Sequence, residues 1–375
     1  MRVDTMWSDR TECDVRVLVL WAHEDSPNLG VAALARGSQE LLQEAWPDAE
    51  LTFVNFGRRP DWFFIGSPRA MLRERLTGRH GMRRALADFD VVWDTRSGDS
   101  FTDIYGQGRD RLMSTIYEMA VRAGAHGVLA PQTIGPFDTA PGRRRARRTL
   151  GASTLAFARD PQSAAAAETL GHPVDDTIAD VVFALPSQPV PTTTDVLLNV
   201  SGLLWQDNPH VAAVEYRQAV RGVAQALRDE GREVTLLAHV VESSVPDSDA
   251  AAVRGLAAEL DLPFHIPDGL DDVRGVIASS RLVIAARMHA CLNALSQGVP
   301  AIPMAYSRKF APLLNSLGWE HGVDLRDGGA PVEAVLEQAH GGSLTADAGL
   351  VAQRARTSIE RCVRRLRTLG AGSRL

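Results

Sequence analysis

Short apolar runs alternate with longer segments of helical period along most of the chain. In the first half, the apolar runs cover residues 15–21, 51–56, 91–95, 127–132, 154–158 and 181–185. Segments with apolar positions at helical spacing separate them, as at residues 31–45 and 111–123. Buried strands that alternate with helices are typical of a parallel sheet covered on both faces. The pattern therefore predicts an α/β fold that begins with a Rossmann-like, doubly wound domain.

The alternation stops once and then restarts. Residues 186–194 read PSQPVPTTT, a stretch rich in Pro and Thr that predicts a linker. Apolar runs follow at residues 196–200, 234–238, 263–266, 282–286 and 301–305, again with helix-like segments between them. We expect an N-terminal domain over residues 1–186, a linker over 187–194, a C-terminal domain over 195–345, and a final helix and tail over 346–375.

Two doubly wound domains joined by one short linker enclose a central cleft, and the carboxyl ends of their strands face it. Residues 350–369 are amphipathic and rich in Arg, so we expect a helix that packs back across both domains. No internal repeat of roughly 20–50 residues is visible, which argues against a solenoid.

Composition narrows the class of protein. Of the 375 residues, 45% are hydrophobic and 23% charged, which is ordinary for a globular protein. A net charge of −6 and a pI near 5.9 argue against nucleic acid as the main partner. Cys13, Cys291 and Cys362 are odd in number and far apart, so we expect neither a disulfide framework nor a bound metal. No run is apolar enough for a signal peptide or a membrane span, which predicts a cytoplasmic enzyme.

Residues 143–148 (RRRARR) are a local exception to the acidic balance. A basic run at the start of a helix is most often a solvated face. A second interpretation is contact with a diphosphate-linked substrate or with the anionic inner leaflet of a membrane. Each basic residue near that leaflet contributes about 1 kcal/mol to membrane binding. The second interpretation would make the protein peripheral at that leaflet.

Arg287, Met288 and His289 stand where the apolar run 282–286 gives way to a helical stretch over residues 290–297. A helix N-terminus offers free backbone N–H groups and the positive end of the helix dipole. A guanidinium and an imidazole at this corner predict an anion site that contains a proton-transfer group. The structural alternative is that Arg287 pairs with a carboxylate and that His289 packs in the domain cleft.

Other polar residues also fall at the expected strand ends. Arg159 directly follows the run 154–158 and stands at a second strand-to-helix corner. Arg159 and Arg287 would therefore approach a ligand in the cleft from opposite sides. The remaining candidates follow other strands: Asn28, Asp99, Asp103, Gln132 and His239. For each of these, an ordinary turn, a capping loop or a packing role is the alternative.

Several motifs in order along the chain resemble the polysaccharide pyruvyl transferase family. They are NLG at residues 28–30, RSGDSFTDIYG at 96–106, IGPF at 134–137, FARDPQSAAAAETLG at 157–171, ADVVF at 179–183, LLAHV at 236–240, and ARMHACLNALSQGVPAIPMAYSRKFAPLLNSLG at 286–318. The resemblance implies a GT-B-like architecture and the transfer of a pyruvyl group from phosphoenolpyruvate to a sugar as a ketal. One position departs from the family pattern, because Val31 stands where an Asp is usual.

The resemblance also implies residue roles. Phosphoenolpyruvate is the donor substrate and no cofactor is expected; Arg159, Arg287, Met288 and Lys309 would bind it, and His289 would serve as general acid and base. The acceptor would be a saccharide or a lipid-linked oligosaccharide held by Asn28, Asp99, Asp103, Gln132 and His239. Two alternatives are a GT-B glycosyltransferase that uses a nucleotide sugar and a non-catalytic saccharide-binding protein with the same fold. The sequence specifies no oligomeric state.

Overall fold

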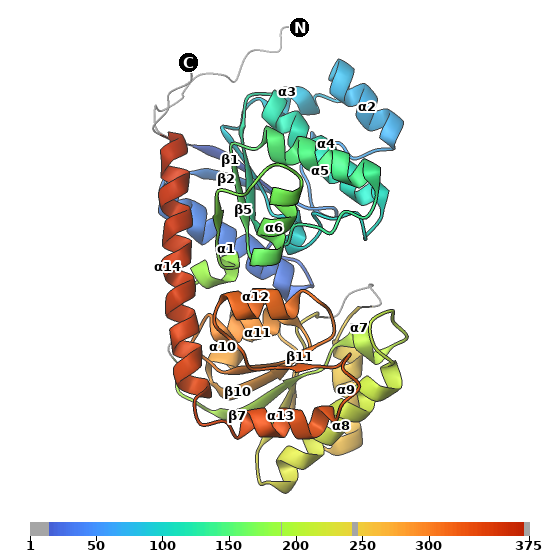
Figure 1. The fold of residues 1–375 in the computed structure, drawn as a ribbon, viewed down its shortest axis with the longest axis vertical. Helices are drawn as coiled ribbons and strands as arrows, with labels where there is room; N and C mark the ends of the chain where they lie inside the picture. The colour runs from blue at the N-terminus through green and yellow to red at the C-terminus, as the bar shows by residue number, and fades with distance from the viewer. Residues whose placement is uncertain (1–14, 189, 242–246, 371–375) are drawn as a thin grey trace, which may run out of the picture.

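The computed structural model describes residues 15–188, 190–241 and 247–370. Two parallel sheets of six strands each form two domains that lie end to end along the long axis of the molecule (Figure 1). The first sheet has the order β2-β1-β3-β4-β5-β6, with β1 at Arg16–Leu20, β2 at Glu50–Val54, β3 at Val91–Asp94, β4 at His126–Gln132, β5 at Leu155–Ala158 and β6 at Asp176–Thr177. The predicted α/β fold of two doubly wound domains is confirmed.

Both faces of the first sheet are covered, which explains the continuous apolar runs. Val17 and Val19 of β1 face a core that continues into the second domain, whereas Leu18 and Leu20 face a separate core. The covering elements are α1 (Leu29–Ala45), α2 (Pro68–Thr77), α3 (Met82–Leu86), α4 (Gln107–Arg122), α5 (Ala140–Ala152), α6 (Pro161–Thr169) and the 3₁₀ helices η1 (Arg96–Gly98) and η2 (Val181–Ala184).

The strand expected at residues 181–185 was wrong, because these residues form η2. The Asp180 side chain accepts a hydrogen bond from Val182 N and thereby starts a helical turn. Val181, Val182 and Phe183 are buried in the core next to α1, where the Val181 carbonyl lies close to Gly37. An apolar run shows that a segment is buried, but a short one does not distinguish a strand from a helical turn.

The second sheet has the order β12-β11-β10-β7-β8-β9. Its strands are β7 (Thr194–Asn199), β8 (Val234–Leu237), β9 (Phe264–His265), β10 (Ser280–Ala285), β11 (Ala301–Ala305) and β12 (Val323–Asp324). Its helices are α7 (Gly202–Trp205), α8 (Ala213–Asp229), α9 (Ala250–Leu260), α10 (Leu270–Ala278), α11 (Met288–Leu295), α12 (Phe310–Ser316) and α13 (Pro331–Ala339). The five expected strands are present, and β12 is an additional short edge strand.

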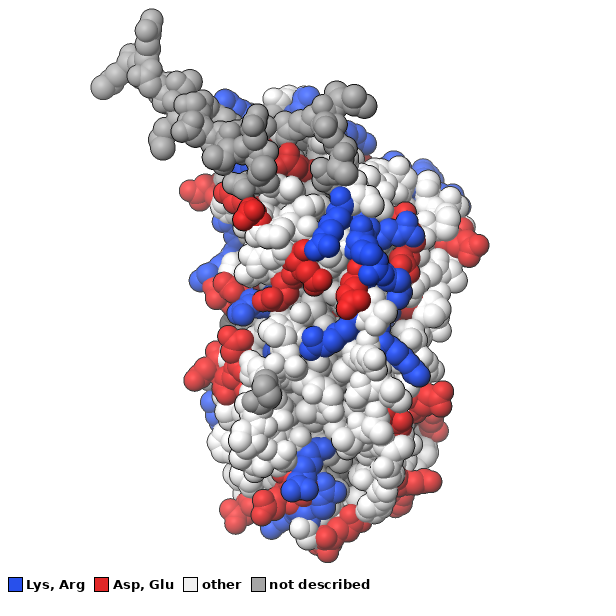
Figure 2. All heavy atoms as spheres, turned by 90° about the vertical axis from the view of Figure 1, so that its left-hand side faces the viewer, with Lys and Arg blue, Asp and Glu red and all other residues white. Residues whose placement is uncertain are grey.

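The last helix, α14 (Leu344–Gly370), runs along both domains (Figure 1). It packs against α1 and η2 of the first domain and against α11 of the second. Ser358 accepts a hydrogen bond from Ala179 N at 2.7 Å, and Arg361 pairs with Asp176 at 3.1 Å. Helix α14 therefore ties the end of the first sheet to the second domain. On the face that Figure 2 shows, cationic and anionic side chains lie interspersed.

The arginine run at residues 143–148 is divided by the structure between buried and exposed positions. Arg145 is 6% exposed, pairs with Asp110 at 2.6 Å and donates to Gln107. Arg148 is exposed and pairs with Glu118 at 3.4 Å, and Arg143, Arg144 and Arg147 are exposed as well. Arg145 and Arg148 therefore link α5 to α4. No helix in the described part of the chain is both long and apolar enough to cross a membrane.

The cysteines contribute to packing where the structure describes them. Cys291 and Cys362 are buried free thiols whose pKa burial raises. Cys13 lies outside the described residues.

Candidate active site

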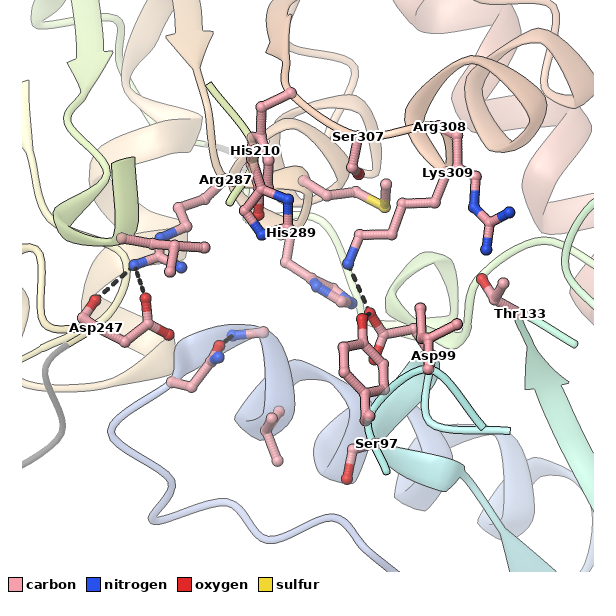
Figure 3. A pocket seen from close by; sticks show the side chains of 18 of the residues that line it. Ser97, Asp99, Thr133, His210, Asp247, Arg287, His289, Ser307, Arg308 and Lys309 are labelled. Carbon is pink, nitrogen blue, oxygen red and sulfur yellow. Dashed lines mark hydrogen bonds and ion pairs between the residues drawn. The ribbon is translucent and has the colours of Figure 1, made fainter. Parts of the chain in front are cut away.

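A cavity of about 680 Å³ opens between the two domains at the carboxyl ends of their strands. Figure 3 shows side chains from both domains that point into it. Its charged lining residues are Arg159, Arg287, Arg308, Lys309 and Arg326 among the cations, and Asp99 and Asp247 among the anions. Cationic side chains outnumber carboxylates among these lining residues, but most of them form ion pairs within the protein that reduce the positive charge a ligand meets.

Arg287 lies between β10 and α11, at the corner that the sequence predicts. Its guanidinium pairs with Asp247 at 2.6 Å and with the fully buried Asp249 at 2.7 Å. Burial lowers the pKa of Arg287, but the Asp249 and Asp247 carboxylates outweigh it and raise that pKa. The structural alternative for Arg287 is thus realised in part, because the guanidinium lines the cavity while protein carboxylates hold it.

Asp249 fastens this corner to the backbone around it. Its carboxylate accepts hydrogen bonds from Gly202 N at 2.7 Å and from His239 N and Val240 N at 3.0 Å each. It also accepts from Nε of Arg287 at 3.1 Å. The protein itself therefore supplies the hydrogen-bond donors that a buried carboxylate requires.

His289 is the second residue of α11, and its side chain lies against the start of α1. A Cβ atom at Gly30 would come within 2.7 Å of the imidazole Nδ1, so only glycine allows this approach. The imidazole Nε2 is buried, has no hydrogen-bond partner among the described residues, and lies 3.8 Å from Oδ2 of Asp180. An unpartnered imidazole nitrogen at a cavity is free to exchange a proton with a ligand.

The environment of His289 holds the ring neutral. Burial lowers its pKa below the ordinary value, Asp180 opposes this effect, and Arg159 and Lys309 add to the lowering. His289 is therefore a proton acceptor at neutral pH. An anionic ligand next to the ring would raise the pKa again.

Arg159, at the end of β5, is the corresponding arginine of the first domain. It is 2% exposed, pairs with Asp180 at 2.7 Å and donates from Nε to Thr133 Oγ1 at 3.0 Å. Asp180 is fully buried and lies between Arg159 and His289, so it positions both side chains. The cavity thus joins a guanidinium of one domain to the imidazole of the other through one carboxylate.

Lys309 and Asp99 form an ion pair across the cavity. The Lys309 ammonium, from the second domain, lies 2.6 Å from the Asp99 carboxylate of the first domain (Figure 3). The Tyr105 hydroxyl donates to the same carboxylate at 3.0 Å, and burial together with the negative charge of Asp99 raises the pKa of Tyr105 to about 12. These three side chains therefore link the two domains across the cavity.

Arg308 and Ser307 bring further donors to the cavity. The Arg308 side chain extends toward Thr133 (Figure 3) and has no ion-pair or hydrogen-bond partner among the described residues. The Ser307 hydroxyl is buried and also lacks a partner there. Both groups are available to a ligand.

His239 lines the cavity as a neutral histidine. Asn293 donates its side-chain amide to His239 Nε2 at 3.1 Å, and Arg274 fixes that amide by donating to Asn293 Oδ1 at 2.9 Å. Burial, with the nearby His289 and Arg287, lowers the pKa of His239 to about 3. His239 therefore stays unprotonated at physiological pH.

Eight of the ten residues predicted from sequence line the cavity: Asn28, Asp99, Arg159, His239, Arg287, Met288, His289 and Lys309. Asn28 also caps α1 by accepting from Gly30 N at 3.0 Å. Asp103 and Gln132 do not line it. Asp103 accepts from the backbone of Asp138 and Thr139 ahead of α5, and the fully buried Gln132 donates to Asp94 O. Local structure explains both, so we leave them out of the candidate site.

Sequence reasoning does not identify three carboxylates that pair with side chains of the cavity, which are Asp180, Asp247 and Asp249. Asp180 precedes an apolar run that favours a strand, although an acid before such a run is a recognisable helix-capping signal. Asp247 and Asp249 lie in a polar segment with no periodicity to indicate their position. Among the described residues, no group of three or more His, Cys, Asp or Glu side chains is arranged to hold a metal ion.

Two parallel six-stranded sheets with a cavity between them define the class of fold, which is the GT-B-like α/β architecture. Within that class, the chain belongs to the polysaccharide pyruvyl transferase family, whose model matches residues 28–308. The resemblance inferred from the sequence motifs is thereby confirmed. No curated protein matches the chain significantly in sequence.

Solved structures share the fold at low sequence identity. The UDP-GlcNAc 2-epimerase of Neisseria meningitidis, bound to UDP-GlcNAc, has a TM-score of 0.59 at 10% identity and covers 94% of this chain and 99% of its own. The UDP-GlcNAc 2-epimerase of Methanocaldococcus jannaschii has a TM-score of 0.58 at 11% identity, covering 96% and 100%. The spinosyn rhamnosyltransferase SpnG has a TM-score of 0.50 at 14% identity, covering 94% and 100%. These similarities concern the architecture alone.

Proposed function

We propose that this transferase moves a pyruvyl group from phosphoenolpyruvate to two hydroxyls of a saccharide, which forms a cyclic ketal. The observation that carries the proposal is the unpartnered His289 Nε2 in a cavity with Arg159, Arg308 and Lys309. Phosphoenolpyruvate carries a carboxylate and a phosphate, so it matches several cationic side chains around one proton-transfer group.

In this proposal the donor lies between the N-terminus of α11 and the first domain. The backbone N–H groups of Met288 and His289 begin that helix, and they suit one anionic group of the donor. Arg159 and Arg308, which has no partner within the described residues, suit the other. Arg287 contributes mainly by holding the corner in shape, because Asp247 and Asp249 neutralise it.

The chemistry assigns His289 two successive roles. Protonated His289 donates its proton to the methylene carbon of phosphoenolpyruvate, and the first sugar hydroxyl attacks the adjacent carbon and returns its proton to the imidazole. The second hydroxyl then displaces phosphate at the same carbon, and its proton leaves with the phosphate. One pyruvyl ketal and one phosphate are formed, and His289 ends in its starting state.

The lowered pKa of His289 agrees with this sequence of steps. A bound phosphoenolpyruvate would bring negative charge to the ring and raise its pKa, so donor binding would favour protonation. Acid catalysis is thereby linked to donor binding.

The acceptor would lie against the first domain. Asn28, Asp99, Tyr105 and Thr133 line that wall of the cavity with carboxylate, amide and hydroxyl groups, which are typical partners of sugar hydroxyls. A saccharide or a lipid-linked oligosaccharide fits this chemistry. The four exposed arginines of the run, Arg143, Arg144, Arg147 and Arg148, would provide the contact with an anionic membrane.

Calorimetric titration with phosphoenolpyruvate, and separately with uridine diphosphate, tests the donor. We expect saturable binding of phosphoenolpyruvate to the wild type and to His289→Asn. Phosphate release in the presence of a library of glycan acceptors should fall by about 10²–10⁴-fold in His289→Asn.

His340→Asn is the matched control, because His340 is exposed and pairs with Glu230 away from the cavity. Its phosphate release should equal that of the wild type. Binding of uridine diphosphate without binding of phosphoenolpyruvate would replace this proposal by nucleotide-sugar transfer.

A further inference from the structure

The Lys309–Asp99 ion pair stands between the two binding regions of the cavity. Lys309 precedes α12 in the second domain, and Asp99 follows η1 in the first. Their side chains are 27% and 22% exposed and meet at 2.6 Å. In this arrangement each residue neutralises the other: the lysine is kept from an anionic donor and the carboxylate is kept from an acceptor hydroxyl.

The charges around the pair hold both groups ionised. Burial raises the pKa of Asp99, but Lys309, Arg159 and the Tyr105 hydroxyl outweigh it and lower that pKa to about 2. Burial lowers the pKa of Lys309, whereas Asp99 raises it above its ordinary value. A doubly charged phosphate entering next to Lys309 would compete with the single charge of Asp99.

We propose that Lys309 exchanges partners during the reaction: the donor phosphate takes Lys309 from Asp99, and the released carboxylate accepts a hydrogen bond from an acceptor hydroxyl. The donor therefore binds first and creates part of the acceptor site. Asp99 is the positioning residue for that hydroxyl, and Lys309 couples the two binding events.

Three features of the structure support the exchange. Lys309 and the unpaired Arg308 are adjacent in the chain and extend into the same cavity (Figure 3), so a phosphate can be shared between them. Tyr105 donates to Asp99 and stays in place to hold the carboxylate after Lys309 leaves. Without Lys309, Asp99 loses the ammonium that lowers its pKa and becomes a stronger acceptor of a hydroxyl proton.

The identity of the donor rests on the proposed function, but the exchange itself requires only a ligand that bears a phosphate. Calorimetric titrations with phosphoenolpyruvate and with inorganic phosphate test it in four proteins: wild type, Asp99→Asn, Lys309→Met and the double variant. Asp99→Asn frees the lysine, so we expect about tenfold tighter binding of both probes. Lys309→Met should weaken binding, and Asp99→Asn should then bring no gain.

The double variant separates an exchange from a general field effect. Removal of one negative charge by Asp99→Asn could strengthen anion binding without any contact with Lys309. In that case the gain would persist unchanged in the Lys309→Met background, and the exchange would be overturned. Asp271→Asn serves as control, because it removes another interdomain ion pair, with Arg36 at 3.7 Å, from outside the cavity lining, and it should leave both affinities unchanged.

The two probes separate the exchange from the proposed function. If inorganic phosphate follows the expected pattern and phosphoenolpyruvate binds to none of the four proteins, the donor is wrong and the exchange holds. If phosphoenolpyruvate binds with an affinity that Asp99→Asn does not change, the donor holds and the exchange fails. Absence of binding by both probes overturns both.

Discussion

The two arginine corners of the cavity have the same local construction and different surroundings. Arg159 connects β5 to α6 and Arg287 connects β10 to α11, so each guanidinium stands where a strand gives way to a helix. Arg159 meets one carboxylate, Asp180, whereas Arg287 meets two, Asp247 and Asp249. The neighbouring carboxylates therefore distinguish the corners, although their backbones are alike.

This difference separates a ligand-facing corner from a scaffold corner. At Arg159, the shared carboxylate leads directly to His289, whose Nε2 has no partner among the described residues. At Arg287, Asp249 also accepts three backbone N–H groups and so holds the loop around it. A strand-to-helix corner places a guanidinium at a cleft, and the carboxylates around it determine whether it binds a ligand or the protein.

We expect the largest effect, on the free energy of unfolding, from removing the carboxylate that holds the Arg287 corner together. Asp249→Ala leaves Arg287 buried with fewer partners and three backbone N–H groups without an acceptor. We expect a loss of about 3–5 kcal/mol in the free energy of unfolding, measured by urea denaturation.

Asp247→Asn provides the comparison at the same corner. The Asp247 side chain is 30% exposed, and in this variant the backbone carbonyl of residue 247 still accepts a hydrogen bond from Arg287. The free energy of unfolding should therefore fall by only about 1 kcal/mol. Equal losses in the two variants would contradict the assignment of Asp249 as the centre of the scaffold.

A smaller effect, confined to turnover, is expected at the ligand-facing corner. Gly30→Ala places a methyl group within 2.7 Å of the His289 imidazole and moves the ring relative to Asp180. We expect a loss of about 10–100-fold in phosphate release from phosphoenolpyruvate with acceptor.

Gly108→Ala is the matched control, because no atom lies within 4 Å of the added methyl group. It should leave the rate unchanged. Wild-type turnover in Gly30→Ala would show that the position of His289 does not limit the reaction.

The smallest effect is a pH dependence of stability at the scaffold corner. The folded protein holds the pKa of His239 at about 3, below the ordinary value of about 6.5. The unfolded chain therefore binds a proton that the folded protein excludes, and stability falls as the pH decreases from about 6.5 toward about 3. Between pH 7.5 and 5.5 we expect His239 to account for a loss of about 1 kcal/mol.

Urea denaturation at several pH values measures this loss, and His239→Gln should reduce it. The glutamine amide oxygen can accept the hydrogen bond from Asn293 without titrating. An unchanged pH dependence in His239→Gln would assign the loss to other groups. His289 contributes in the same direction, because its pKa is also lowered.

The sequence predicted the strand order along the chain and the polar residues at strand ends with few errors. Arg287 and His289 stand at the β10–α11 corner, and Arg159 directly follows β5, as the apolar runs indicate. The segment at residues 181–185 shows where this reasoning fails. Its apolar residues are buried as expected, but Asp180 turns the backbone into a 3₁₀ helix instead of a strand.

The partners of the charged residues could not be predicted in the same way. Asp180 lies 21 residues from Arg159, Asp249 lies 38 residues from Arg287, and Asp99 lies 210 residues from Lys309. No local period relates the members of such pairs. The carboxylates that neutralise the arginines were therefore missed, although the arginines themselves were found.

The sequence by itself determined the alternation of strands and helices and the positions where chemistry-bearing side chains leave the strands, because the period of burial is a local property of the chain. Only the tertiary structure decided which charges meet in the cavity. The pairs that form depend on how α1 and α14 pack one domain against the other. This packing brings Asp99 to Lys309 and Asp180 to His289. Electrostatic pairing acts through space, so it follows from the packing of the two domains rather than from spacing along the chain.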